Sequence, residues 1–195
     1  MCCVEDYTEK GRVMEFKWMG KGCKISDWAR FYSPEVITIG TDCRIDDFCM
    51  LSGGVGIELK DHIHIACGVY MYGGGGILVE DFVGISTHVN IWSQSDDFSG
   101  RSMFCPQIPE KYKPHLKKAK VHIGKQVLIG CGVSILPGVT IGEGCMIGAH
   151  SLVTKDTLPW SLYTGVPAKK IDNVSQDMLK LREQFLEEYN GKRSA

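Results

Sequence analysis

Nine thiols and the adjacent carboxylates of one polar segment carry the most evident chemistry in this 195-residue sequence. The odd number of cysteines, and an N-terminus without the apolar segment of a secretory signal, favour reduced thiols in a cytoplasmic protein over a disulfide framework. A zinc site would need Cys-x-x-Cys spacing, which is absent, since Cys2 and Cys3 are directly adjacent. We therefore expect no metal centre.

The carboxylate pair is Asp96–Asp97, in the segment IWSQSDDFSG. Paired carboxylates commonly bind the hydroxyl groups of sugars, and a carboxylate can also accept a proton where its site raises its pKa or orients the donor. Trp92 offers an apolar face for a sugar ring, with packing at a subunit interface as an equal alternative.

Charge and hydropathy exclude two classes of partner. The formal net charge is −1, and acidic and basic residues are interspersed, so the basic stripe of a nucleic-acid-binding protein is absent. No segment approaches the ~18 apolar residues of a membrane span. We expect neither nucleic-acid binding nor membrane insertion.

A six-residue repeat must position these side chains. From residue 123 onward an aliphatic residue recurs at every sixth place, and a small or β-branched residue follows four places later. The aliphatic positions are Ile123, Ile129, Ile135, Ile141, Ile147 and Val153, and the second positions are Val127, Val133, Val139, Cys145 and Ser151.

Period six fits neither an amphipathic helix nor an alternating strand. It indicates short strands joined by corners, stacked in coils about 4.8 Å apart, with one aliphatic side chain per face directed to a common axis. A β-sandwich is the alternative, but its turns recur every 8–12 residues. We expect Ile129, Ile135 and Ile141 to be buried on one shared sheet.

Earlier segments repeat the pattern less strictly, beginning at Ile25, Ala29 and Phe31. Three further runs carry aliphatic residues with small or β-branched partners, so three of the cysteines are expected to be packing residues. The runs are Ile39, Ile45 and Leu51 with Cys43 and Cys49; Leu59, Ile65 and Met71 with Ile63 and Val69; and Val79, Ile85 and Ile91 with Val83 and Val89. Cys145 is the third such cysteine.

Three segments break the repeat. GGVG (53–56) and GGGG (73–76) shift its phase and are interpreted as insertions at turns. The break at about 93–120 is longer, polar and contains three prolines. A loop of this length inside a compact fold is functional or disordered, and its aromatic residues favour function.

The C-terminal segment predicts a helix and tail over 173–195, following a β-helix domain over 1–172. Asn173 and Gln176 have capping-box spacing, and Gly191 can end the helix. Met178, Leu181 and Phe185 share one helical face. We expect this helix to cover one open end of the stack and the polar N-terminal segment to cover the other.

The motifs ILPGVTIGEGCMIGAHSLVTKD and YTGVPAKKI, with the tandem hexads, resemble the hexapeptide-repeat acyltransferases. The branch that they resemble contains the galactoside and maltose O-acetyltransferases and sugar acetyltransferases of polysaccharide loci. The resemblance covers roughly residues 20–172. It implies an all-β, left-handed parallel β-helix that is triangular in section with three hexads per coil. It also implies a homotrimer with active sites between neighbouring subunits, and acetyl-CoA bound along the C-terminal coils without a metal.

The resemblance also assigns positions beside coenzyme A. Small residues match the channel for the pantetheine arm, since a close backbone approach needs residues without bulk. Lysines match positions near the phosphates of the nucleotide end, where Lys170 is a substitute for Lys169. The matched positions are Gly130, Cys131, Ala149, Thr154, Lys155 and Lys169.

The expected general base is missing. Family members carry a histidine near the start of the long loop, but the matching place here is Asp96, with Gln94 or Asp97 in shifted alignments. Three explanations stay open. One of the aspartates acts as the base, or His88 or His115 does, or the acceptor is an amine that needs less help. Gln94 and Trp92 are then candidate substrate-binding residues.

We therefore expect an acetyltransferase that O-acetylates a sugar, with surface polysaccharide synthesis as one setting. N-acetylation of an amino-sugar nucleotide is the alternative. A catalytically inactive scaffold is a further alternative, because fold alone does not prove function. A zinc hydratase would need three convergent histidines, and His62, His64 and His88 differ in their phase within the hexad.

Overall fold

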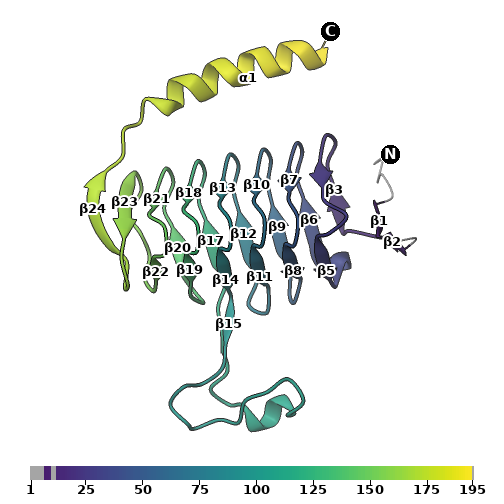
Figure 1. Ribbon diagram of the computed structural model, residues 1–195, viewed down its shortest axis with the longest axis vertical. Coiled ribbons are helices and arrows are strands. Elements are labelled where there is room, and N and C mark those ends of the chain that lie inside the picture. The colour runs from purple at the N-terminus through teal and green to yellow at the C-terminus, as the bar shows by residue number, and fades with distance from the viewer. Residues whose placement is uncertain (1–6, 10–11, 195) are drawn as a thin grey trace.

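Short strands and corners alternate along the chain and wind it into a column of stacked coils (Figure 1). The computed structural model describes residues 7–9 and 12–194. Three parallel sheets form the three faces of the column. The structure is therefore the expected parallel β-solenoid with a C-terminal helix.

Face 1 is the largest sheet, and its last strand is antiparallel to its neighbour. It consists of β4 (Lys24–Ile25), β7 (Arg44–Ile45), β10 (His64–Ile65), β13 (Gly84–Ile85), β18 (Leu128–Ile129), β21 (Met146–Ile147), β23 (Ser161–Thr164) and β24 (Lys169–Asn173).

Faces 2 and 3 each have six strands. Face 2 consists of β5 (Arg30–Tyr32), β8 (Met50–Ser52), β11 (Tyr70–Tyr72), β14 (Asn90–Trp92), β19 (Ser134–Ile135) and β22 (Leu152–Val153). Face 3 consists of β3 (Trp18–Met19), β6 (Ile37–Ile39), β9 (Ile57–Leu59), β12 (Ile77–Val79), β17 (Val121–Ile123) and β20 (Thr140–Ile141).

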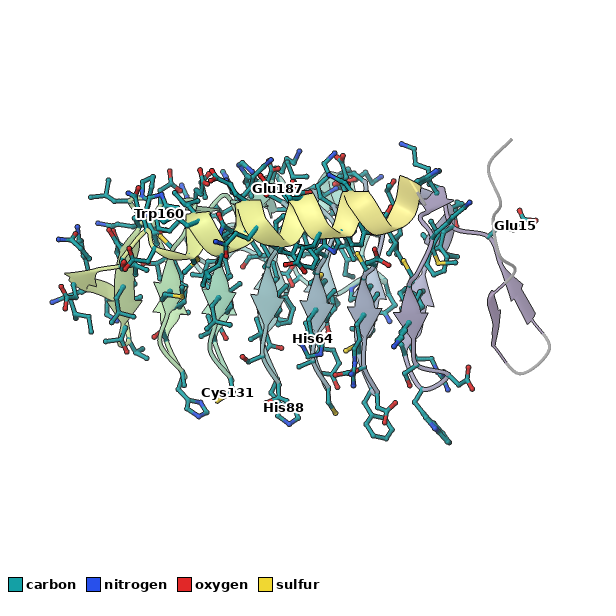
Figure 2. All side chains as sticks on the ribbon, turned by 90° about the horizontal axis from the view of Figure 1, so that it is seen from above. Glu15, His64, His88, Cys131, Trp160 and Glu187 are labelled. Atoms are coloured by element: carbon teal, nitrogen blue, oxygen red, sulfur yellow. The ribbon has the colours of Figure 1, made fainter. Side chains whose placement is uncertain are left out.

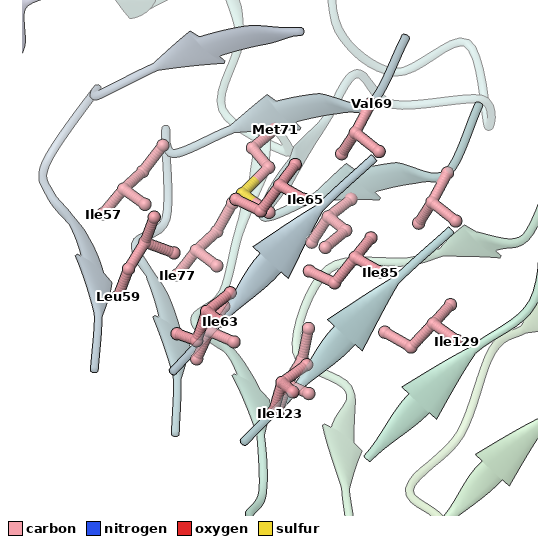
Figure 3. Packing of buried hydrophobic residues seen from close by; sticks show 14 of the residues in the cluster. Ile57, Leu59, Ile63, Ile65, Val69, Met71, Ile77, Ile85, Ile123 and Ile129 are labelled. Atoms are coloured by element: carbon pink, nitrogen blue, oxygen red, sulfur yellow. The ribbon is translucent and has the colours of Figure 1, made fainter. Parts of the chain in front are cut away.

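The hexad side chains fill the interior of the column (Figure 3). Ile129, Ile135 and Ile141 are each 0% exposed, but they lie on faces 1, 2 and 3 respectively, so the expectation of one shared sheet is wrong. Three hexads complete one coil, and Ile129 therefore pairs with Ile147 on the next coil. Burying each such side chain contributes about 1.5–3 kcal/mol to folding.

The cysteines in the small positions are packing residues, as expected. Cys43, Cys49 and Cys145 are buried, and each thiol donates a hydrogen bond to a carbonyl of the following coil, over distances of 3.1, 3.1 and 2.8 Å. Burial raises the pKa of the Cys49 thiol to about 11. Cys2 and Cys3 lie outside the described residues.

Three edges separate the faces, and each is a column of corners. The first edge, between faces 1 and 2, contains residues 27–28, 47–48, 67–68, 87–88, 131–132 and 149–150. From the second coil onward its corners alternate bulky and glycine residues: His88 adopts a left-handed φ of 58° and its ring lies over Gly68 of the preceding coil, where a Cβ would be 2.6 Å from Nδ1. Glycine leaves the space that the ring occupies.

The second edge, between faces 2 and 3, carries all three breaks in the repeat. GGVG, GGGG and the 93–120 loop lie on successive coils there, so the first two are turn insertions as predicted. The buried Ser93 fixes the root of the loop: its Oγ donates to the Tyr72 carbonyl (2.6 Å) and accepts from Gly75 N (2.9 Å), and its carbonyl accepts from Ala119 N (2.9 Å).

The loop continues outward as the antiparallel pair β15 (Gln94–Ser95) and β16 (Lys117–Lys118), and its tip extends well away from the column (Figure 1). It contains the 3₁₀ turn η2 (Glu110–Tyr112); a second turn, η1 (Pro34–Val36), lies on the second edge nearer the N-terminus.

The C-terminal helix does not cover an end of the stack. Helix α1 (Met178–Ser194) runs lengthwise along the third edge, between faces 3 and 1 (Figure 2). Phe185 packs edge-on against His62 (5.4 Å) and Phe82 (6.1 Å), and Arg182 donates to Gln126 Oε1 over 2.7 Å. The expectation of an end cap is therefore wrong.

The bounds of α1 also differ from the expectation. Asn173 ends strand β24, so it does not cap the helix, and the helix continues past Gly191. Met178, Leu181 and Phe185 do share a face, because all three border the groove between α1 and face 1. No helix in the described part of the chain has the length and apolar character that crossing a membrane demands.

At the N-terminal end, Phe16 is 5% exposed and packs edge-on against Phe31 at 5.0 Å, which closes the first coil. The hairpin of β1 (Tyr7–Glu9) and β2 (Arg12–Met14) precedes it. Residues 1–6 and 10–11, which belong to the segment expected to cap this end, lie outside the described residues.

Candidate active site

A cavity of about 680 Å³ lies at the root of the long loop, on the second edge. Three of the residues singled out in the sequence border it: Trp92, Gln94 and Asp96. The loop and the column together enclose it, because Phe98 and Pro106 come from the loop beyond Asp96 and most of the other lining residues come from the ends of face 2 strands and the corners that follow them. These are Ser52, Gly54, Tyr72, Gly73, Gly74, Leu136 and Pro137, with Ser95 beside Gln94.

Two aromatic rings form one wall of the cavity. Tyr72 and Trp92 occupy the same place on successive strands of face 2, and their rings stack at 4.2 Å with an interplanar angle of 3°. Partial burial raises the pKa of the Tyr72 hydroxyl. Sequence reasoning missed Tyr72. The 20-residue coil length, which the two glycine insertions set, is the signal that would have placed it beneath Trp92.

The side chain of Gln94 lies over Gly74 of the preceding coil. A Cβ on Gly74 would collide with the Gln94 side chain, so that side chain lies flat over the GGGG corner. Among the described residues, no hydrogen bond to its carboxamide is present, which leaves a donor and an acceptor available at the cavity.

Asp96 and Asp97 have different environments. Asp96 is exposed and borders the cavity. Asp97 closes a turn within the loop, where its carboxylate accepts from the backbone N–H groups of Ser99 (2.9 Å) and Arg101 (3.1 Å). Hydrogen bonds from Ser99, and then from the Arg101 backbone, hold the pKa of Asp97 below its ordinary value. A carboxylate stabilised in this way is a weak proton acceptor.

The two histidines considered as bases lie apart from the cavity. His88 is exposed on the first edge (Figure 2). It precedes β14, whereas Asp96 lies beyond the other end of that strand. His115 is exposed in the loop, where its backbone N–H donates to Ser102 Oγ at 3.0 Å. Neither borders the cavity.

Five of the six positions assigned to coenzyme A fall on the two edges of face 2, and Lys169 lies on face 1. Gly130, Cys131 and Ala149 lie together at the first edge, where a Cβ on Gly130 would be 2.7 Å from Ala149 N. Thr154 and Lys155 follow β22 at the second edge, and Lys169 is exposed in β24. One chain therefore separates these positions by the width of face 2.

The histidines considered for a zinc site do not converge. His62 stacks on Phe82 beneath α1, His64 lies on face 1 with Nε2 2.8 Å from Asp46 Oδ2, and His88 lies on the first edge. Among the described residues, no group of three or more His, Cys, Asp or Glu side chains could hold a metal ion.

The chain is similar in sequence to known acyltransferases. Residues 120–155 match the family model "Bacterial transferase hexapeptide (six repeats)". Over 175 residues the chain is 42% identical to dTDP-4-amino-4,6-dideoxy-D-glucose acyltransferase of Escherichia coli, covering 89% of this chain and 91% of that protein.

Solved structures agree. AntD, an N-acyltransferase from Bacillus cereus solved with dTDP and 3-hydroxybutyryl-CoA, superimposes with a TM-score of 0.84 at 42% identity, covering 90% of this chain and 92% of AntD. AntD has also been solved with single substitutions at a serine and at an aspartate ten residues further along. Galactoside acetyltransferase, solved with coenzyme A, shares the fold at 22% identity and a TM-score of 0.56, over 82% of this chain and 66% of that one.

Proposed function

We propose, from the premise that this chain belongs to the hexapeptide-repeat acyltransferase family, that it transfers an acyl group from coenzyme A to the amino group of a nucleotide-linked amino sugar. The observation that carries this proposal is the near-full-length similarity, at 42% identity, to two acyltransferases. One is named for dTDP-4-amino-4,6-dideoxy-D-glucose, and the other, AntD, has been solved with dTDP-4-amino-4,6-dideoxyglucose and coenzyme A. This similarity favours the amine acceptor over the sugar hydroxyl that the sequence alone put first.

The carboxylate that the loop brings to the cavity is a sufficient base for an amine acceptor. The nitrogen lone pair attacks the thioester carbonyl, the N–C bond forms, and the C–S bond breaks to release coenzyme A. The nitrogen gives up one proton, which ultimately leaves with the thiol or enters solvent. An amine is nucleophilic once deprotonated, so a carboxylate beside the cavity suffices where a hydroxyl acceptor would need a stronger base.

We assign proton transfer to Asp96, which borders the cavity with an exposed carboxylate. Ser86 and Asp96 form the only serine–aspartate pair ten residues apart in this sequence, the spacing of the two substituted positions in AntD. Ser86 follows β13 on face 1, beside the first edge, and sequence reasoning missed it. We add it to the site as a substrate-contacting residue.

The complete site forms between two subunits in this proposal. Ser86, with the small residues Gly130 and Ala149, lies at the first edge, whereas Asp96 and Lys155 lie at the second edge. A neighbouring copy that places its second edge beside this first edge joins the two groups. This arrangement supports the homotrimer expected from the sequence.

The donor is an acyl-CoA, held along Gly130, Cys131 and Ala149 on one chain, with lysines at its phosphates. Acetyl-CoA is the first donor to test and 3-hydroxybutyryl-CoA, which AntD binds, is the second. Nucleotide-linked sugars and acyl-CoA are both cytoplasmic metabolites, so the proposal places the enzyme in the cytoplasm.

The test is an acyl-transfer assay with purified protein. Each donor is incubated with dTDP-4-amino-4,6-dideoxyglucose, the release of coenzyme A thiol is followed, and mass spectrometry identifies the product. The matched acceptor control is the dTDP-sugar with a hydroxyl at the same carbon. An acylated product from the amino sugar alone supports the proposal, whereas acylation of the hydroxyl sugar at an equal or higher rate contradicts it.

A further inference from the structure

Face 1 carries a row of basic side chains on its N-terminal strands. The register of the parallel strands aligns Lys24, Arg44 and His64 on β4, β7 and β10. The side chains of Arg44 and His64 are 63% and 51% exposed. Neighbouring strands are about 4.8 Å apart, so these groups form a continuous polar strip along the column.

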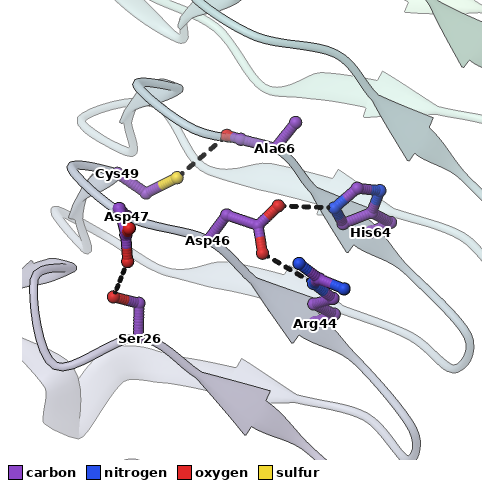
Figure 4. A network of polar contacts seen from close by, with 7 residues as sticks. All are labelled: Ser26, Arg44, Asp46, Asp47, Cys49, His64 and Ala66. Atoms are coloured by element: carbon purple, nitrogen blue, oxygen red, sulfur yellow. Dashed lines mark hydrogen bonds and ion pairs between the residues drawn. The ribbon is translucent and has the colours of Figure 1, made fainter.

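Asp46 orients two of these groups (Figure 4). Its Oδ1 accepts from Arg44 Nε at 2.6 Å, and its Oδ2 lies 2.8 Å from His64 Nε2. Partial burial alone would raise its pKa, but the hydrogen bonds from His64 and Arg44 hold the pKa of Asp46 below its ordinary value. The terminal guanidinium nitrogens of Arg44 remain directed away from Asp46 as donors for a further anion, and His64 Nδ1 donates to the same anion when the ring carries both protons.

Two exposed aromatic rings adjoin this strip on the first edge. Trp28 and Phe48 occupy successive corners, with ring centroids 6.1 Å apart and an interplanar angle of 44°. They are 54% and 60% exposed. Large aromatic side chains at exposed corners supply a flat apolar surface, on which stacking of a nucleobase contributes about 1–3 kcal/mol.

The order of these groups along the column matches the order of groups in a sugar nucleotide. Trp28 and Phe48 lie on the first two coils, Arg44 and His64 on the second and third, and Ser86 on the fourth. The distance from the second coil to the fourth is roughly 10 Å. An extended sugar nucleotide likewise presents base, diphosphate and sugar in sequence.

The acyl-CoA donor approaches along the same first edge, from the C-terminal coils. Gly130 and Ala149, assigned to coenzyme A, lie on the coils that follow Ser86. Between the strip and these residues the side chains are small, because Ala66, Ser86 and Gly130 occupy equivalent places after β10, β13 and β18. The row of positions directly after these strands therefore presents no bulky side chain between the strip and the reacting carbon, and the ring of His88 lies beside this row, at the corner of the fourth coil.

We propose that the nucleotide half of the acceptor binds here, with its diphosphate on Arg44 and His64 and its base against Trp28 and Phe48. Asp46 is a positioning residue that acts through Arg44 and His64. The inference rests on the proposed function for the identity of the acceptor. It adds a binding subsite on the N-terminal coils, where sequence reasoning considered His64 only as a zinc ligand and placed no residue for the acceptor.

The test is calorimetric titration of the full-length protein with dTDP and, separately, with thymidine. Arg44→Gln and His64→Gln should each weaken dTDP binding about tenfold or more while leaving the weaker binding of thymidine unchanged. Trp28→Leu should weaken both ligands by a similar factor. Lys60→Gln is the matched control, because Lys60 forms an ion pair with Glu58 two residues away, on face 3.

Thermal unfolding of every variant, with a Tm near that of the unaltered protein, establishes that the fold is retained. Unchanged dTDP affinity in both Arg44→Gln and His64→Gln overturns the subsite, as does an equal loss in Lys60→Gln. Failure of the unaltered protein to bind dTDP overturns it as well. The acyl-transfer assay judges the proposed function separately, because an enzyme that acylates the amino sugar and is insensitive to these substitutions keeps its function and loses only the subsite.

Discussion

Asp96 and Asp97 are neighbours in the chain, but different groups hold their carboxylates. Asp97 accepts two backbone hydrogen bonds inside the loop, whereas Asp96 borders the cavity. We expect Asp96→Asn to lower kcat on the order of 100-fold, because positioned proton transfer contributes about that factor or more. The measurement is the steady-state rate of acyl transfer to the amino sugar.

Asp97→Asn is the matched comparison. Asparagine keeps one carbonyl oxygen to accept a hydrogen bond in the turn, so a change of less than about fivefold is expected, within ~1 kcal/mol. If kcat fell equally in the two variants, Asp96→Asn would be disturbing the conformation of the loop and not proton transfer.

His88 offers a second residue-scale test, because its left-handed corner conformation restricts which replacements are informative. Asparagine tolerates positive φ, so His88→Asn removes the imidazole without adding backbone strain. If Asp96 acts as the base, this variant retains most of the activity at every pH tested. A loss as large as that of Asp96→Asn, with the acid limb of the pH–rate profile abolished, would assign the base to His88 instead.

At the scale of the elements, the hexads were predictable and the position of α1 was not. Whether a hexad side chain is buried depends on its own type and its place in the repeat. The burial of Ile129 and its equivalents could therefore be predicted from the spacing alone. Their distribution over three faces follows from the number of hexads in a coil, which spacing does not reveal. The site was only partly predictable for the same reason, since Tyr72 joins Trp92 through a coil length that the GGGG insertion sets.

The place of α1 depends on contacts between distant parts of the chain. Phe185 packs on His62 and Phe82, and Tyr189 hydrogen-bonds to Asp42. We expect Phe185→Ala to weaken the attachment of α1 by about 1–2 kcal/mol, since it removes several aromatic contacts. Hydrogen exchange should then increase in α1 while the coils stay protected. Leu181→Ala, at a side chain that is 65% exposed, is the control and should change exchange little.

Close packing between corners gives a stability prediction. A Cβ on Gly130 would lie 2.7 Å from Ala149 N, a backbone atom that cannot move aside, so Gly130→Ala should destabilise the protein by about 1–3 kcal/mol in urea unfolding. Gly84→Ala is the control, because its Cβ would meet only the end of the Leu128 side chain, at 3.1 Å. That variant should be neutral or slightly stabilising. Similar losses in both would indicate that glycine is needed in these strands for another reason.

For the whole molecule, the decisive feature is that face 2 separates the two groups of site residues. A second copy must then complete each site, and mixed oligomers can test this directly. Asp96→Asn removes the proposed base from the second edge, and Cys131→Trp covers the coenzyme A positions on the first edge. Each variant alone should be nearly inactive, for a different reason.

Co-expression of the two variants should restore part of the activity. In a cyclic trimer with sites between neighbours, every mixed trimer has one intact site, so random assembly of equal amounts recovers about a quarter of the wild-type rate. If each chain instead held a whole site, no mixed trimer would contain an intact one, and the mixture would be as inactive as its parts. Light scattering during size-exclusion chromatography supplies the subunit number on which this expected rate depends.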